Sequence, residues 1–341
     1  MHPTISIAMC TFNGARYLPA QLRSIALQHR PPDELVICDD GSSDATAEIA
    51  AKFARSAPFE VRNFRNAGNL GSTKNFEQAI SLCHGTVVAL ADQDDVWYPD
   101  KLQTIENAFL FSPSTVAVFS DADLIGPNSV PHRAHLWDSF LFRPQERQRF
   151  AAGDGICVLL KHPIVTGATM AFHADLRHLL LPIPADHTHD RWLAFLLAAR
   201  GRFTPIAESL MQYRCHPSQQ IGPGRSNFRT RFQQACKTGP DFYIEETAQF
   251  RQLAERLQQY RSDFPDVERA LNEINKKIVH RKHRAHLPPA SITRIPRVFG
   301  EMLNGGYWRY SEGWQSIVKD LAGVFAAQQT LEKPTMGLKK S

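Results

Sequence analysis

The sequence predicts an α/β fold, in which a mostly parallel sheet is flanked by helices, followed by a helical extension. Short apolar runs rich in Val, Ile and Leu alternate with segments of helical spacing over the first part of the 341-residue chain, as they do where crossover helices join parallel strands. After Gly222-Pro223-Gly224 the pattern changes to amphipathic helices. We therefore predict two parts, residues 1–224 and residues 225–341.

Four strands are predicted first, and a helix follows each of the first three. The strands cover residues 5–10, 34–38, 61–64 and 86–91, and the helices lie around 17–26, 45–53 and 76–83. The fourth run, from Thr86 to Ala91, is apolar throughout, which indicates a strand buried on both faces. Because crossovers between parallel strands are right-handed, these units predict one sheet with helices on its faces.

The later elements are less regular. Val116–Ser120 and Val165–Phe172 are strand-like, residues 126–155 are rich in loop residues, and a helix is expected from Arg191 to Ala199. In the extension, apolar residues fall on one helix face over 250–260 and again over 267–278, with a break at Asp263 to Pro265. From about Leu331 the composition is typical of disorder.

Composition predicts a cytoplasmic protein. Hydrophobic residues make up 43% and charged residues 21% of the chain, and no apolar run approaches the roughly 20 residues that span a bilayer. The N-terminus shows no basic and apolar export signal. The six cysteines lack paired spacing, so we expect free thiols in a reducing compartment.

Charge is distributed unevenly along the chain. Residues 1–224 contain 19 Lys and Arg against 22 Asp and Glu, whereas residues 225–341 contain 20 against 12. A basic helical segment could meet nucleic acid or an anionic membrane; we expect peripheral membrane contact through 225–341 and no nucleic acid. The cluster behind this expectation comprises Lys276, Lys277, Arg281, Lys282 and Arg284, with the aromatic residues Phe299, Tyr307, Trp308, Tyr310 and Trp314. The alternatives are a solvated helical surface and docking on the first part.

Two acidic clusters follow predicted strands. Asp92-Gln93-Asp94-Asp95 comes directly after the buried fourth strand, and Asp39-Asp40 ends the second. Open α/β sheets bind ligands at this carboxyl edge. Carboxylates packed so closely repel one another unless they are protonated or share a cation. The pattern therefore predicts a Mg²⁺ or Mn²⁺ site for a diphosphate. For Asp39-Asp40 taken alone, a simple turn before a capped helix is the alternative.

At this point the chain resembles the family-2 glycosyltransferases of the GT-A fold. Over about residues 4–220, the resemblance is carried by Thr11-Phe12-Asn13, Asp39-Asp40-Gly41-Ser42, Asn66-Ala67-Gly68-Asn69-Leu70-Gly71 and Asp92-Gln93-Asp94-Asp95. A closer likeness, to bacterial rhamnosyltransferase-like members that act on cell-surface polysaccharides, is carried by Asp92 to Trp97, His189 to Trp192, Tyr213 to His216 and Tyr310 to Trp314.

The resemblance implies transfer of one sugar, possibly rhamnose in view of the closer likeness, with inversion at its anomeric carbon. The donor would be a nucleotide-diphosphate sugar, with UDP or dTDP favoured, and the acceptor a glycan or lipid-linked oligosaccharide. Residues 1–125 would bind the nucleotide-sugar, and residues 126–224 would hold the acceptor and the general base. Processive synthases carry a Gln-x-x-Arg-Trp motif, whereas here Thr188-His189-Asp190 precedes Arg191-Trp192, so single-sugar transfer fits better.

The resemblance also implies roles for single residues. Asp94 would ligate Mn²⁺ or Mg²⁺, with Asp92 near the ribose or the metal. Asp190 would be the general base; capping the helix that follows is its alternative role. Thr11 and Phe12 would line the base pocket, and Asp39 would accept a hydrogen bond from a pyrimidine imide. Arg214 would pair with phosphate, and His216 would complete the metal shell. For Arg214 and His216 the alternative is a surface turn.

Two other classes of function remain open. A nicotinamide-dependent oxidoreductase would place an acid near Asp39, but residues 11–16 lack the Gly-x-Gly-x-x-Gly pattern that the pyrophosphate requires. A non-catalytic module that binds nucleotide-sugar or glycan would tolerate loss of Asp94 or Asp190, and both are present.

Overall fold

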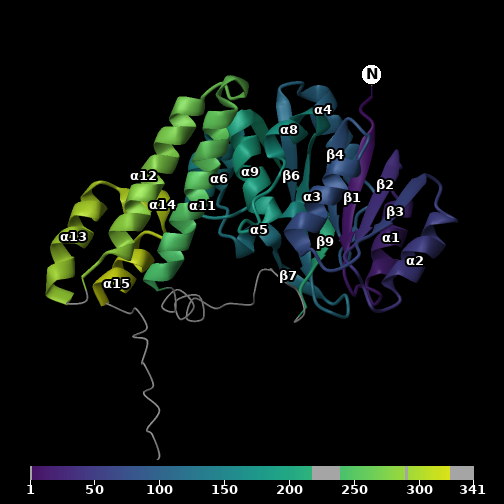
Figure 1. Cartoon of the computed structure of the whole chain (residues 1–341), viewed down its shortest axis with the longest axis horizontal. Helices are drawn as coiled ribbons and strands as arrows, with labels where there is room; N and C mark the ends of the chain where they lie inside the picture. Colours follow the sequence, from purple (N-terminus) through teal and green to yellow (C-terminus); the bar gives the residue numbers. More distant parts are fainter. Residues whose placement is uncertain (1, 217–238, 289–290, 323–341) are drawn as a thin grey trace, which may run out of the picture. The chain divides into compact units, whose positions relative to one another are not determined.

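A computed structural model describes residues 2–216, 239–288 and 291–322 (Figure 1). The chain divides into two compact units: one groups the described residues of Met1–Arg225 with Ala248–Ile278, and the other groups those of Ser226–Thr247 with Val279–Ser341. The boundary that we predict near residue 225 lies outside the described residues and stays a prediction. Residues 248–278, which we assigned to the extension, share a unit with the sheet.

One mixed sheet forms the centre of the first unit. Its order is β3-β2-β1-β4-β8-β6-β9-β5, and β7 pairs with β6. The strands are β1 (Ile5–Thr11), β2 (Glu34–Asp39), β3 (Glu60–Arg65), β4 (Val87–Asp92), β5 (Val96–Trp97), β6 (Thr115–Ile125), β7 (Pro131–His135), β8 (Met170–His173) and β9 (Arg202–Arg214). The pairs β1–β2, β1–β4 and β2–β3 are parallel, whereas β8 runs antiparallel to both β4 and β6.

Helices cover both faces of this sheet. Those that follow the strands are α1 (Leu18–Ala26), α2 (Thr46–Ala54), α3 (Ser72–Leu82), α4 (Lys101–Phe111), α5 (Leu136–Ser139), α6 (Pro144–Arg149), α7 (Gly155–Lys161), α8 (Arg177–Leu180) and α9 (His189–Arg200). Apolar residues of α1, α2 and α4 join alternate residues of β1, β2 and β4 in one buried core. α3 packs against β1 and β2 without joining that core, and it therefore covers the opposite face.

The predicted α/β class with flanking helices is confirmed, and one predicted strand is shorter than expected. Within Val165–Phe172, residues Gly167–Thr169 form a 3₁₀ turn and the strand begins only at Met170. The hydrogen bond from Thr169 N to Thr166 O closes this turn at 3.0 Å. An apolar run does not distinguish a buried turn from a strand, because both exclude water.

The helices of the extension are α11 (Pro240–Gln259), α12 (Val267–Ala285), α13 (Ser291–Leu303), α14 (Gly306–Tyr310) and α15 (Trp314–Ala322). Buried ion pairs stabilise the second unit: Arg284 Nε donates to Asp320 Oδ2 at 2.7 Å, and Arg281 pairs with Glu246. In the first unit, Lys277 is buried and donates to the carbonyl of Leu160. Three members of the predicted basic cluster are therefore buried, so the surface that we expected from all five does not exist.

The sequence predicts neither disulfide bonds nor membrane-spanning segments. Cys10, Cys38, Cys83, Cys157 and Cys215 form no disulfide bond in the described structure, and Cys236 lies outside the described residues. Within the described ranges no helix is long and apolar enough to cross a membrane. The predicted disorder from about Leu331 falls outside them.

Candidate active site

The ends of β1, β2 and β4 meet at one edge of the sheet. Strand register places Thr11 beside Asp39 and Cys10 beside Asp92. The Thr11 hydroxyl donates to Asp39 Oδ1 at 3.0 Å, and Ser42 N donates to Asp39 Oδ2 at 3.1 Å. β1 lies between the strands that carry the two acidic clusters, so both clusters open at this edge.

The side chain of Gln93 joins the β1 end to the second acidic cluster. Phe12 N donates to Gln93 Oε1 at 2.9 Å, and Gln93 Nε2 donates to Phe12 O at 3.0 Å. A Cβ at Gly14 would lie 1.9 Å from Gln93 Oε1, so a larger residue there would displace the Gln93 amide. Phe12 is 42% exposed and follows Thr11, which lies beside Asp39.

Asp40 has a different task from Asp39. Its Oδ1 accepts hydrogen bonds from Leu70 N and Asn66 Nδ2 at 2.8 and 2.9 Å, and its Oδ2 accepts one from Gly71 N at 2.9 Å. Gly71 has φ +83°, a conformation that favours glycine. Asp40 therefore fixes the Asn66 to Gly71 loop before α3, and the sequence did not separate this role from that of Asp39.

The acidic cluster contains three carboxylates in different environments. Burial, together with the nearby charges of Asp94 and Asp190, raises the pKa of Asp92 to about 7. Burial and the charges of Asp94 and Asp92 raise the pKa of Asp95 well above its usual range. Asp95 Oδ1 accepts a hydrogen bond from Arg214 N at 3.0 Å, while its buried Oδ2 has no hydrogen-bond partner in the described structure.

Lys101, at the start of α4, lies buried beneath this cluster. Its Nζ donates to Ala168 O at 2.7 Å and lies 4.2 Å from the centre of the Trp97 ring. Burial lowers the Lys101 pKa to about 7, against the charges of Asp95 and Asp92, which raise it. This role of Lys101 could not be predicted, because a lysine at the start of a helix is usually solvated.

Residues of β9 and of the segment that follows it complete the cluster. His216 Nε2 lies 2.7 Å from Asp94 Oδ2. Arg214 is 2% exposed; its Nε donates to Asp94 O at 2.6 Å, its Nη1 donates to Ser129 Oγ at 2.9 Å, and its guanidinium carbon lies 4.7 Å from the centre of the Tyr17 ring. Arg214 thus shapes the acidic loop through protein acceptors. Its contact with phosphate stays a prediction.

Asp190 lies in the first turn of α9, and its charge acts on Asp92. Thr188 occupies the N-cap position but makes no side-chain cap bond, whereas Asp190 Oδ1 accepts a hydrogen bond from Arg191 N at 2.7 Å. Asp190 is therefore not the N-cap, although it binds a backbone N–H of the first turn. The neighbouring His189 stacks on Phe76 with ring centres 4.0 Å apart, and burial lowers its pKa while Asp190 opposes the change. A Cβ at Gly167 would lie 2.5 Å from His189 Nε2, so glycine is needed there.

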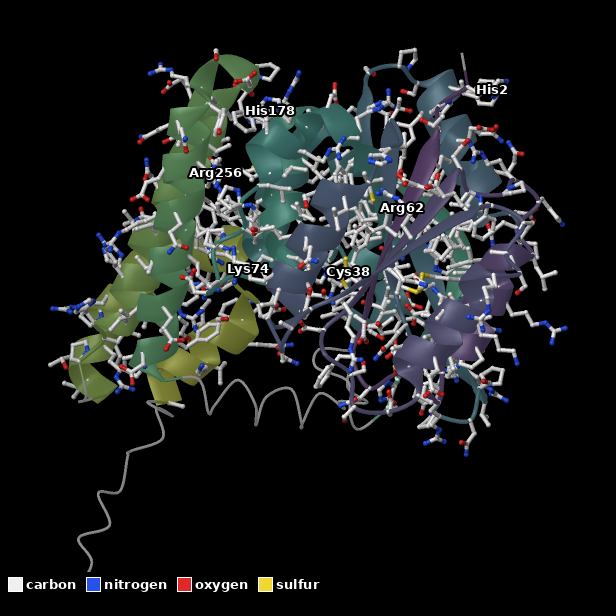
Figure 2. All side chains as sticks on the ribbon, turned by 45° about the vertical axis from the view of Figure 1, so that its right-hand side comes forward. His2, Cys38, Arg62, Lys74, His178 and Arg256 are labelled. Atoms are coloured by element: carbon white, nitrogen blue, oxygen red, sulfur yellow. The ribbon has the colours of Figure 1, made fainter. Side chains whose placement is uncertain are left out.

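The segment before α9 is held from two sides. From α3, the Thr73 hydroxyl donates to His187 O at 2.8 Å and Lys74 Nζ donates to Ile183 O at 2.7 Å. From α11, Arg256 Nη1 donates to Leu179 O at 2.8 Å; Lys74 and Arg256 are labelled in Figure 2. This part of α11 belongs to the same unit, and it helps to hold the chain that precedes Asp190.

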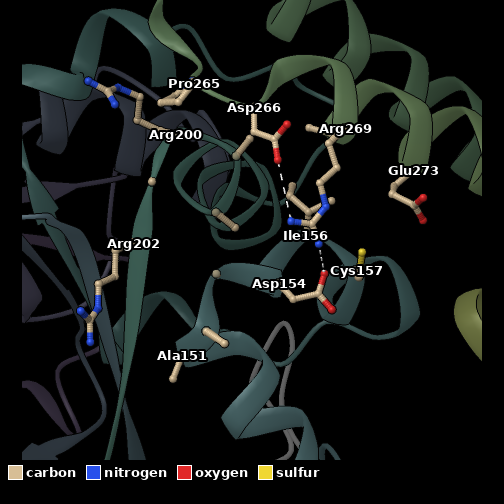
Figure 3. A pocket seen from close by; sticks show the side chains of 16 residues that line it. Ala151, Asp154, Ile156, Cys157, Arg200, Arg202, Pro265, Asp266, Arg269 and Glu273 are labelled. Atoms are coloured by element: carbon tan, nitrogen blue, oxygen red, sulfur yellow. Dashed lines mark hydrogen bonds and ion pairs between the residues drawn. The ribbon is translucent and has the colours of Figure 1, made fainter.

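A separate cavity of about 410 Å³ lies at the other end of α9 (Figure 3). Arg269 pairs there with Asp154 at 2.7 Å and with Asp266 at 3.8 Å. Arg200 lines this cavity ten residues beyond Asp190, which is about 15 Å along a helix. The cavity is therefore distinct from the acidic edge. In the described residues no three His, Cys, Asp or Glu side chains are arranged as a metal centre.

Comparison with known proteins agrees with this geometry. Residues 6–165 match the family model Glycosyl transferase family 2. The dTDP-rhamnosyl transferase RfbG of Shigella flexneri is 29% identical over 249 residues, which are 70% of this chain and 81% of that protein. An uncharacterized glycosyltransferase of Nostoc sp. is 28% identical over 216 residues, which are 62% of this chain and 65% of that protein. The chain thus spans just under two thirds of the Nostoc relative.

Two solved structures share the fold. A crystal structure of S. aureus TarS in complex with UDP-GlcNAc has a TM-score of 0.56 and 16% identity, and the match covers 94% of this chain and 89% of that one. The mannosyltransferase PcManGT from Pyrobaculum calidifontis, in complex with GDP-Man and Mn²⁺, has a TM-score of 0.51 and 16% identity, with coverage of 95% and 86%. The family match over residues 6–165, the relatives and the shared α/β fold together support a family-2 glycosyltransferase.

Proposed function

We propose that the protein transfers a single sugar from a nucleotide-diphosphate sugar to an acceptor hydroxyl. The observation that carries the proposal is the pair Asp94 and His216, with Oδ2 and Nε2 2.7 Å apart, beside Asp92 at the sheet edge that also holds Asp39. Negative charge develops on the nucleoside diphosphate as it departs. The side chains at this edge are of the kinds that bind a divalent cation, which would stabilise that charge.

The cation would be Mn²⁺ or Mg²⁺, held by Asp94 and His216 with Asp92 nearby. These residues fit such an ion, because carboxylate and imidazole are acceptable ligands and nucleotide sites commonly use one or two carboxylates plus substrate phosphates. Burial, together with the charges of Asp94 and Asp190, raises the Asp92 pKa to about 7, and a bound cation would favour the ionised carboxylate. When bound, the ion would stabilise the leaving diphosphate as a Lewis acid. The Mn²⁺ in the PcManGT complex supports this choice.

The nucleotide would lie against Thr11, Phe12 and Asp39. Phe12 offers a half-exposed ring for stacking. Asp39, fixed by Thr11 and Ser42, would accept the N3 hydrogen of uracil or thymine. We therefore favour UDP or dTDP, which agrees with the names of RfbG and of the TarS complex. Rhamnose is the sugar that the RfbG likeness suggests.

Asp190 would take the proton from the acceptor hydroxyl as the new bond forms, and inversion would follow from attack opposite the diphosphate. Its support is its place at the start of α9, within electrostatic range of Asp92. Thr73, Lys74 and Arg256 hold the preceding segment, which would keep the base in position.

The acceptor would be a glycan or lipid-linked oligosaccharide of a surface polysaccharide, reached on the cytoplasmic side of the membrane through peripheral contact of 225–341. In this proposal residues 1–224 supply the catalytic groups. Residues 248–278 contribute support, because Gln252 Oε1 lies 2.9 Å from His187 Nε2 and Gln249 Oε1 accepts from Arg191.

A thermal-shift screen of UDP-, dTDP- and GDP-sugars, each with and without Mn²⁺, tests the donor class. We expect the UDP or dTDP series to raise the melting temperature only with metal, because a ligand that binds the native state alone stabilises it. The best donor is then incubated with glycan acceptors, and the anomeric configuration of the product is read by NMR. Donor binding without nucleotide release or product would favour the alternative, a non-catalytic binding module.

A further inference from the structure

Gln93 is the one uncharged residue in the run from Asp92 to Asp95, and its side chain contacts the end of the neighbouring strand. β1 and β4 lie side by side (Figure 1). The Gln93 amide forms a two-way pair with the backbone of Phe12, accepting from its N–H at 2.9 Å and donating to its carbonyl at 3.0 Å. A carboxylate could accept the first hydrogen bond but could not donate the second. This contact therefore requires an amide among the acids.

The segment that follows β1 is also held from the β2 side. Asn13 N donates to Ser42 Oγ at 2.8 Å, and Gly14 N donates to Thr46 Oγ1 at 2.8 Å. These bonds come from the loop and helix that follow β2, whereas the Gln93 bonds come from the end of β4. The segment is therefore fastened between the ends of the two strands that carry the acidic clusters.

The far end of the same segment touches the residues that follow β9. The centre of the Tyr17 ring lies 5.0 Å from that of the His216 ring and 4.7 Å from the guanidinium carbon of Arg214. Tyr17 N donates to Gly14 O at 3.0 Å, which ties this ring to the segment. The segment thus meets the surroundings of the acidic cluster twice, through Phe12 at one end and through Tyr17 at the other.

We propose that Gln93 is a positioning residue, which fixes the spacing between the nucleobase pocket and the site of the diphosphate and its metal. This inference rests on the proposed function and adds a residue to it. A nucleoside diphosphate must reach Phe12 and Asp94 at once, and the gain from binding both ends depends on how well their spacing matches the ligand. Gln93 sets that spacing, because it belongs to the acidic loop and holds the Phe12 backbone.

Gly14 offers a second way to break this contact. A Cβ there would lie 1.9 Å from Gln93 Oε1 and 2.3 Å from its Cδ, so it would displace the end of a flexible side chain. Gly14 is not among the residues with positive φ, and alanine therefore fits its backbone. Gly14→Ala should remove the contact while residue 93 stays glutamine.

The test compares ligands with and without a nucleobase. UDP, dTDP and pyrophosphate, each as its Mn²⁺ complex, are titrated into the full chain by calorimetry. In Gln93→Met, which keeps the length of the side chain and removes the amide, we expect the dissociation constants of UDP and dTDP to rise about tenfold or more. That of Mn²⁺-pyrophosphate should stay within about twofold of the parent, because this ligand occupies only the metal side.

The two substitutions should act through one contact. Gly14→Ala should repeat the selective loss of nucleotide binding, and the double variant should lose no more than either single variant. Gln103→Met is the matched control for the glutamine, since the described contacts of that amide lie within its own helix, to Glu106 and Asn107. Gly300→Ala is the control for the glycine, because its added Cβ would meet nothing within 4 Å. Both controls should bind as the parent does.

The possible failures are distinguishable. Equal weakening of pyrophosphate and nucleotide in Gln93→Met would show that Gln93 only supports the acidic loop, and it would overturn the inference. Additive losses in the double variant, or parental nucleotide binding in Gln93→Met, would overturn it too, while the proposed transfer would stand. A parent that binds UDP or dTDP but not Mn²⁺-pyrophosphate would contradict the separation into two half-sites. A parent that binds neither nucleotide would overturn the proposed donor class together with this inference.

Discussion

His216 Nε2 and Asp94 Oδ2 lie 2.7 Å apart although 122 residues separate them in the sequence. β9 creates this contact, because it runs parallel to β6, pairs antiparallel with β5, and carries the chain back past the acidic loop. The parallel half of the sheet and the later antiparallel half therefore both contribute to one site.

Replacing Asp94 by Asn should abolish metal-dependent donor binding and lower turnover by about 100-fold or more, because the metal ligand and its charge are lost together. The measurement is donor hydrolysis and transfer over a Mn²⁺ titration. Asp100→Asn is the control, since its side chain is 70% exposed and pairs only with His29 among the contacts described. Equal metal response in Asp94→Asn and the parent would remove Asp94 from the site.

Replacing Asp190 by Asn should leave donor affinity unchanged and lower transfer by about 10²- to 10⁴-fold, because an amide cannot accept the acceptor proton. Calorimetric donor binding and product formation are compared in the same preparation. Asp186→Asn, at an exposed position four residues earlier, should behave as the parent does. Full transfer by Asp190→Asn would assign the base to another residue.

Replacing Lys101 by Met should destabilise the protein by about 2 kcal/mol, because it removes the buried positive charge that offsets Asp92 and Asp95. Lys276→Met, which loses only the exposed pair with Glu273, should change stability by less than about 0.5 kcal/mol. Urea denaturation gives both values. If Lys101→Met and the parent have equal urea midpoints, Lys101 does not offset the negative charge of the acidic cluster.

The second unit should lose stability as pH falls from 6.5 towards 4. Burial, with Arg284 and Arg281, lowers the His280 pKa from 6.5 to about 4, although Glu301 opposes the change. In this pH window the unfolded chain binds the proton and the folded chain does not, so the free energy of unfolding rises with pH, by at most about 3 kcal/mol. Urea midpoints at several pH values measure the effect. His280→Gln should flatten the dependence, and an equally steep profile in that variant would contradict the assignment.

β1, β2 and β4 could be predicted because burial on both faces favours apolar runs, as in Val87 to Ala91. β3 is a partly exposed edge strand. The acidic edge could be predicted because the carboxyl ends of parallel strands meet. β5, only two residues long, could not be predicted, since its pairing with β9 is set by contacts far along the chain. Residues 126–155 likewise fold into β7, α5 and α6 without a periodic sequence signal.

Within the site, the sequence was a better guide to which residue types gather there than to what each residue does. Asp94 and His216 could be placed together only through the family resemblance. The roles of Lys101 and Gln93 were not predicted, because a helical lysine and a loop glutamine are usually solvated. The five-residue basic cluster misled because composition does not report burial: Arg281 and Arg284 form buried ion pairs, and Lys277 donates to a carbonyl.

The most direct test of the central claim is anomalous diffraction, at the manganese edge, from crystals of the chain grown with Mn²⁺ and UDP or dTDP. The account predicts one strong peak in contact with the Asp94 carboxylate and the diphosphate oxygens, next to His216, with the base against Phe12 and Asp39. A nucleotide bound at this edge without manganese, or manganese bound away from Asp94, would contradict it.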